Sequence, residues 1–142
     1  HERMSRVLIG SRLPSKQAAP VSAAIRAVLE PLPQLLRQTV TFDNGTEFAR
    51  HFVLKAIGTQ TFFCDPHAPW QKGGIENAIG RMRRGLPRKT DLASLDDDRF
   101  LSLIALYNAT PRKCLDWKTP AEAFCAHLLH FERESTSQPA RE

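Results

Sequence analysis

Apolar and polar positions along the first 64 residues follow two periods, which predict strands and helices in alternation. Three short runs rich in β-branched, aliphatic and aromatic residues are typical of strands: residues 6–13 (RVLIGSRL), 38–42 (QTVTF) and 59–64 (TQTFFC). Apolar residues recur at helical spacing over residues 19–32, and the prolines that follow would end this helix. Residues 47–57 also favour a helix, for which Gly58 is a suitable C-terminal cap.

The second half of the chain favours helices. The loop DPHAPWQKGG, with its two prolines and two glycines, precedes a helix that we expect to open at Gly74 or Ile75. Its apolar stripe is predicted to consist of Ile75, Ile79, Met82 and Leu86, with Pro87 as the stop. Further helices are expected over residues 96–107 and after Thr119-Pro120-Ala121-Glu122, a sequence typical of a helix N-terminus.

Two carboxylates lie at the edges of these predicted elements. Asp43 follows the strand at residues 38–42, and Glu76 lies in the first turn of the helix that begins near Gly74. In α/β sheets, sites form outside the carboxyl ends of strands, and hard divalent cations take carboxylate ligands there. A metal site is one interpretation. The alternatives are that Asp43 only forms the turn with Asn44-Gly45, and that Glu76 only complements its helix dipole.

The charge of the chain favours a polyanionic partner. Its formal net charge is +5 and its pI is about 9.5. Basic residues gather around the candidate acid Glu76: Lys72, Arg81, Arg83, Arg84, Arg88 and Lys89. A solvated basic face would give the same cluster, but its position next to a candidate acidic site favours nucleic acid.

The remaining composition limits the class of protein. The cysteines, Cys64, Cys114 and Cys125, are odd in number and widely spaced, which fits free thiols in a reducing cytosol. Cys64 and His67 have no second pair at zinc-ligand spacing, so a zinc site is not expected. No apolar run approaches the ~18 residues of a membrane span, and we predict a cytoplasmic protein without a membrane partner.

Three stretches in order resemble the catalytic core of DDE transposases, bacterial ones of the insertion-sequence-thirty family in particular. These stretches are FDNGTEFARH, FFCDPHAPWQKGGIENAIGRMRRGLPRKTDL and LYNATPRKCLDWKTPAEAF. The match runs from about Val40 to Phe124 and, more weakly, over residues 2–36. Any one motif alone would be unspecific. Their order, together with the spacing of the second and third family acids, makes the resemblance specific.

The resemblance implies an RNase H-like, retroviral-integrase-type fold, with helices flanking a mixed sheet in three layers. It implies DNA transposition and integration through Mg²⁺ or Mn²⁺, with hydrolysis at the element's ends followed by strand transfer to target DNA. Asp43 would be the second catalytic and metal-binding acid, and Glu76 the third. Residues expected to contact DNA are Trp70, Gln71, Lys72, Gly73, Asn77, Arg81, Arg83, Arg84 and Arg88. The intact enzyme is expected to be a homo-oligomer.

The chain departs from the family pattern at the first acid. No Asp precedes Asp43, and the family's opening strand would lie upstream of Glu2-Arg3. We therefore expect a fragment: residues 1–131 as a partial integrase core that lacks its first strand, and residues 132–142 as a polar, disordered tail. Without the first acid, strand transfer by this chain alone is not expected. The alternatives are a non-catalytic remnant that binds DNA or oligomerises, and a basic α/β domain whose acids are structural.

Overall fold

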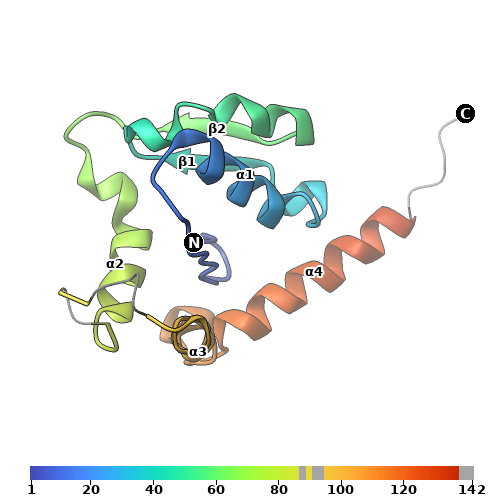
Figure 1. The fold of residues 1–142 in the computed structure, drawn as a ribbon. Coiled ribbons are helices and arrows are strands. Elements are labelled where there is room, and N and C mark those ends of the chain that lie inside the picture. Colours follow the sequence, from blue (N-terminus) through green and yellow to red (C-terminus); the bar gives the residue numbers. More distant parts are fainter. Residues whose placement is uncertain (87–88, 91–94, 138–142) are drawn as a thin grey trace, which may run out of the picture. The chain divides into compact units, whose positions relative to one another are not determined.

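The structure is a computed structural model that describes residues 1–86, 89–90 and 95–137 (Figure 1). The chain divides into two compact units, one of His1–Arg12 with Lys72–His127 and the other of Leu13–Gln71 with Leu128–Glu142. We describe each unit by itself. The described elements are α1 (Ala18–Leu29), η1 (Gln34–Leu36), β1 (Thr39–Phe42), η2 (Thr46–Phe48), η3 (His51–Ile57), β2 (Gln60–Phe63), η4 (Pro69–Lys72), α2 (Gly73–Met82), α3 (Asp97–Asn108), η5 (Lys113–Leu115) and α4 (Pro120–Ser137).

The second unit contains a sheet of two parallel strands. β1 and β2 pair from Thr39 opposite Gln60 to Phe42 opposite Phe63. The pairing continues one residue further, since the Cys64 N–H donates to the Phe42 carbonyl at 2.8 Å. Parallel strands need a crossover connection, which η2 and η3 supply. Both predicted strands are confirmed. Of the residues of β1, only Phe42 is buried.

Helical segments pack against this sheet, and η3 contacts β2. The core consists of the buried side chains of Phe42, Leu54 and Ile57, and the ring of Phe48 stacks on that of Phe42 with centroids 4.6 Å apart. α1 packs against η2 and η3 and adds Ile25 to the cluster. The helix predicted over residues 19–32 is thus confirmed as α1, although it ends three residues earlier.

The segment between the strands differs from its prediction in one respect. Residues 47–57 are helical, but they form two 3₁₀ turns, η2 and η3, instead of one α-helix. Gly58 is confirmed as the cap, because its φ is +76° and its N–H donates to the carbonyls of Leu54 and Lys55. Leu54 of η3 is fully buried and packs in one cluster with Phe42 of β1.

The first unit packs α2 against α3. Its core contains Leu8, Ala78 and Tyr107, with Ile75 and Met82 against them. The predicted apolar stripe of α2 is therefore partly wrong. Ile79 is 42% exposed, whereas Ala78 is 1% exposed. A methyl side chain allows the helix backbone to approach its neighbours closely, and this small residue carried no strong apolar signal in the sequence.

Residues 6–13 do not form the predicted strand. Instead, both backbone groups of Leu8 bond to one side chain: its N–H donates to Asn108 Oδ1 and its carbonyl accepts from Asn108 Nδ2, each at 2.9 Å. Gly10 packs closely on α3, where an added Cβ would lie 2.7 Å from Ile104 Cδ1. An amide at the end of α3 thus takes the place of a neighbouring strand.

The remaining helices begin as predicted. α3 confirms the helix expected over residues 96–107. At α4, the Glu122 carboxylate accepts the Thr119 N–H at 2.8 Å, and the Glu122 N–H donates to Thr119 Oγ1 at 3.1 Å, which is a capping box. α4 continues to Ser137, so residues 132–137 are helical, where a disordered tail was expected. Pro87 and residues 138–142 lie outside the described residues. A mixed α/β fold is confirmed, and the three-layer RNase H-like core stays a prediction.

Candidate functional site

Asp43 follows β1 directly, at the carboxyl end of the strand as predicted. Its Oδ1 accepts the Gly45 N–H at 3.2 Å, and Asn44 Nδ2 donates to the carbonyl of Cys64 at 2.9 Å. Since Cys64 follows β2, the Asn44 amide ties together the carboxyl ends of both strands. The predicted turn at Asn44-Gly45 is therefore made by side chains. Gly45 has a φ of −68°, so the turn does not require the left-handed region that favours glycine.

A second carboxylate, which the sequence reasoning missed, lies next to this turn. A Cβ added to Gly45 would come within 2.5 Å of Glu47 Oε2, so the Glu47 carboxylate folds back over the glycine. Its signal in the sequence was the spacing of acids in DNGTEF, which places Glu47 one turn after Asp43.

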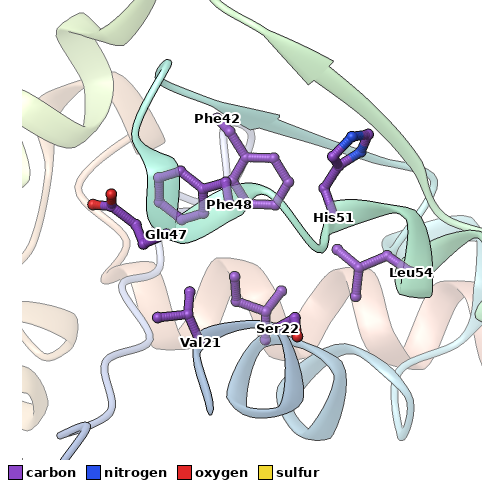
Figure 2. Close-up of a pocket in the computed structure, with 8 residues that line it drawn as sticks. Val21, Ser22, Phe42, Glu47, Phe48, His51 and Leu54 are labelled. Carbon is purple, nitrogen blue, oxygen red and sulfur yellow. The ribbon is translucent and has the colours of Figure 1, made fainter. Parts of the chain in front are cut away.

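A narrow, mostly apolar pocket opens between α1 and the 3₁₀ turns (Figure 2). It is lined by Val21, Ser22, Ile25, Phe42, Glu47, Phe48, His51 and Leu54. Figure 2 shows the Glu47 carboxylate pointing away from the rings of Phe42 and Phe48. The space is about that of a single water molecule, and we attribute it to packing between ring side chains.

Glu76 lies in the first turn of α2, and its side chain is exposed. The helix begins at Gly73, one residue before the predicted start, with Lys72 as its N-terminal cap residue. Asn77 is also exposed, and its Oδ1 accepts a hydrogen bond from Arg81 Nε at 3.1 Å. An exposed carboxylate at a helix N-terminus is accessible to a cation and can adjust its rotamer to bind one.

The loop before α2 is partly ordered by Gln71. The Asp65 N–H donates to Gln71 Oε1, and Gln71 Nε2 donates to Asp65 Oδ2, both at 2.8 Å. The amide that was expected to contact DNA is thus engaged within the loop. Trp70, its neighbour in η4, is 76% exposed. At Gly73 an added Cβ would meet no atom within 4 Å, so this glycine is not required by packing.

The predicted basic surface lies at the end of α2. Arg81, Arg83 and Arg84 are exposed. Neither Arg83 nor Arg84 forms an ion pair with a carboxylate of the described residues, so their charges face solvent. Arg88 lies outside the described residues. Exposed cations such as Arg83 and Arg84 attract phosphate groups at long range.

The two predicted acids belong to different units. Asp43, Trp70 and Gln71 lie in one unit, and the residues from Lys72 to Arg84 in the other, with the division between Gln71 and Lys72. Within the part of the chain that the structure describes, no group of three or more His, Cys, Asp or Glu residues is arranged to hold a metal ion. No described helix is long and apolar enough to cross a membrane.

Comparison with known proteins tests the family resemblance. No protein-family profile matches the chain. The transposase for insertion sequence element IS1086 of Cupriavidus metallidurans is 41% identical over 91% of this chain and 38% of its own length. The transposase InsI for insertion sequence element IS30A of Escherichia coli is 39% identical over 85% of the chain and 32% of its own length. The transposase for insertion sequence element IS4351 of Bacteroides fragilis is 33% identical over 84% of this chain and 36% of its own length.

The chain therefore spans about a third of the length of the curated relatives it matches. Within that span the similarity covers nearly the whole chain, including the motifs around Asp43 and Glu76. The predicted resemblance to insertion-sequence-thirty family transposases is confirmed.

Proposed function

We propose that this chain, a relative of the insertion-sequence-thirty family transposases, is part of a DDE transposase catalytic core of RNase H-like fold. Its reaction would be DNA transposition by metal-dependent phosphodiester hydrolysis and strand transfer. One observation carries the proposal: Asp43 stands at the carboxyl end of a parallel strand, and the Asn44 amide ties that strand end to the next one. Both relatives are named as transposases, which supports the same function.

Asp43 and Glu76 are the residues that would hold Mg²⁺ or Mn²⁺. The donor set fits, because both are carboxylates at the edge of a secondary-structure element and Glu76 is exposed. The hydrogen bond from the Gly45 N–H orients the Asp43 carboxylate at the end of β1. A bound divalent cation would stabilise negative charge on a phosphoryl oxygen.

DNA would bind along the stretch that leads into α2 and along its basic end. Exposed Trp70 offers a flat apolar surface, and Lys72 offers a cation at the helix N-terminus. Arg83 and Arg84 are exposed cations that form no ion pair with a carboxylate of the described residues. These contacts supply affinity and salt dependence, since they address the phosphate backbone. Asn77, Arg81 and Gly73 belong to the same proposed surface.

We propose further that these 142 residues on their own bind metal and DNA but do not catalyse strand transfer. The sequence has no Asp before Asp43, so the first acid of the family has no counterpart in it. A two-metal site without a bridging carboxylate loses the charge that holds both ions. Strand-transfer products from the purified chain with Mn²⁺ would contradict this. The alternative is a non-catalytic remnant that binds DNA or assembles with other copies.

A metal titration tests the proposal directly. Mn²⁺ binding to the 142-residue chain is measured by calorimetry for the parent, Asp43→Asn, Glu76→Gln and Asp98→Asn. Asp98 is the matched control, because it is also an exposed acid in the first turn of a helix. Each of the first two changes should weaken Mn²⁺ binding by roughly tenfold or more, by analogy with the 10–100-fold effect of changes around metal ligands. Equal affinities for all four proteins would refute the metal site.

A further inference from the structure

The turn between Arg112 and Lys118, which we call the Trp117 turn, is held in an unusual backbone conformation. Asp116 and Trp117 have φ values of +53° and +63°, in the left-handed region. Residues other than glycine rarely adopt this region, and bulky side chains least of all. Such strain persists only where the surrounding contacts enforce it.

Hydrogen bonds enforce the conformation. The Trp117 N–H donates to the Arg112 carbonyl, the Arg112 N–H to the Lys118 carbonyl, and the Lys118 N–H to the Leu115 carbonyl, each at 3.0 Å. The turn is therefore closed on itself by backbone groups at both ends.

A buried arginine anchors the turn to the core of its unit. The Arg112 guanidinium lies 4.4 Å from the centre of the Tyr107 ring, and its Nη2 donates to the Tyr107 carbonyl at 3.0 Å. Tyr107 belongs to the core cluster with Leu8 and Ala78. The Trp117 turn is thus fixed to the core of its unit and is not a loose loop.

The Trp117 turn carries an exposed aromatic ring and two exposed cations. Trp117 is 70% exposed, so its ring contributes little to the core. Lys113 and Lys118 on either side are exposed, and neither forms an ion pair with a carboxylate of the described chain. Asp116 is the single acid in the turn. A flat apolar ring flanked by lysines suits a nucleic-acid strand, which offers base faces for stacking and phosphates for the cations.

The Trp117 turn lies in the same unit as the basic end of α2. The pKa of Arg112 is lowered mainly by burial, and repulsion from the charge of Arg81 lowers it further. Arg81 is one of the residues proposed to contact DNA, and its charge reaches the base of the turn. The turn and the basic end of α2 both carry exposed cations and belong to one unit.

We infer that the Trp117 turn is a second DNA-contact element, in which the indole stacks on an unpaired base while Lys113 and Lys118 bind adjacent phosphates. The inference rests on the proposed function only in taking DNA as the partner. The turn contains neither of the candidate acids, Asp43 and Glu76, nor any part of the loop that leads into α2. Inside an intact duplex the faces of each base are covered by the neighbouring base pairs, so the target is a single-stranded segment next to duplex DNA.

The test uses the fluorescence of Trp117 itself. The chain has two tryptophans, and Trp70→Phe leaves Trp117 as the only one. This variant is titrated with a duplex that carries a single-stranded overhang, and separately with a blunt duplex, while the anisotropy of labelled DNA follows binding. We expect the overhang DNA to quench the fluorescence of Trp117 strongly, with the same midpoint concentration as the anisotropy curve. The blunt duplex should quench it little.

Trp117→Gly provides the second readout. Glycine adopts the left-handed region without strain, so the turn should keep its fold, as circular dichroism can verify. Loss of one stacked base should weaken binding to the overhang DNA by roughly fivefold or more, and Trp117→Phe should recover most of the loss. A Trp117→Gly protein that binds the overhang DNA as the parent does, or an unquenched Trp117 at saturation, overturns the inference.

Three outcomes separate the possible failures. If anisotropy shows DNA binding but Trp117 is not involved, the second contact fails and the proposed function stands. Absence of DNA binding by the parent chain overturns both. If Trp117→Gly changes sedimentation but not DNA affinity, the turn contacts another copy of the chain, and the assignment to DNA is wrong.

Discussion

Replacing Asn108 by alanine should detach the N-terminal segment from α3. The side-chain amide makes two hydrogen bonds of 2.9 Å to the backbone of Leu8, each worth about 1 kcal/mol net. Leu8 is buried, so water cannot fully replace the lost partners, which adds about 1 kcal/mol. The higher helix propensity of alanine offsets about 0.5 kcal/mol. The expected loss is therefore about 2.5 kcal/mol.

Hydrogen exchange of the Leu8 amide is the most direct assay. In the parent protein this N–H is protected by Asn108 Oδ1. A loss of about 2.5 kcal/mol corresponds to exchange roughly seventyfold faster. The urea midpoint of the first unit should fall by about 1 M if its m-value is about 2 kcal/mol per M.

Two further variants make the test specific. Asn77→Ala removes another helical asparagine, whose exposed amide contacts only Arg81 within the described chain, and should change stability by no more than about 0.5 kcal/mol. Asn108→Asp keeps an acceptor for the Leu8 N–H but turns the donor into a second oxygen facing the Leu8 carbonyl, so it should destabilise at least as much as alanine. If the Leu8 N–H exchanges at the parent rate in Asn108→Ala, the Asn108 side chain does not protect the backbone of Leu8 as a neighbouring strand would.

Three other outcomes are expected. Gly58→Ala should destabilise the chain by about 1 kcal/mol in urea unfolding because its φ is +76°, while Gly45→Ala, at −68°, should cost less than about 0.5 kcal/mol, since only the flexible Glu47 carboxylate must move. Hydrogen bonds from Thr119 lower the pKa of Glu122 below its usual value of 4.5, so this carboxylate stabilises α4 above that pH and loses the effect as pH falls through its folded-state pKa. Glu122→Gln should therefore reduce stability at pH 7 and flatten its fall toward pH 3. Arg83→Ala should reduce the slope of log affinity for DNA against log salt by about 0.9 if Arg83 contacts one phosphate.

The elements that local chemistry specifies could be predicted from the sequence. α1 ends where prolines follow it, α4 begins at a capping box, and Gly58 caps η3 in the left-handed region. In each case the decisive residues lie within four positions of the boundary. β1 and β2 were likewise evident from short runs of β-branched and aromatic residues.

The predictions that were wrong concern features that are decided by contacts between residues far apart in the sequence. Residues 6–13 have the composition of a strand, but a strand requires a partner, and the partner here is the side chain of Asn108, one hundred residues away. The buried face of α2 was misplaced because Ala78 is buried by close helix packing, which periodicity of large apolar residues does not reveal. The candidate acids were easier to place, since each stands at the end of an element that the sequence predicts.

The structure also separates two kinds of polar residue that a shared motif does not distinguish. Asn44 and Gln71 lie in motif stretches, yet their amides are engaged by Cys64 and Asp65 within the chain. Their substitution should act through the shape of the turn and loop. Arg83 has no such engagement within the described residues and lies exposed. Its role must therefore be sought in what approaches from solvent. Substitutions of the first kind should alter stability and function together, whereas those of the second should alter DNA binding alone.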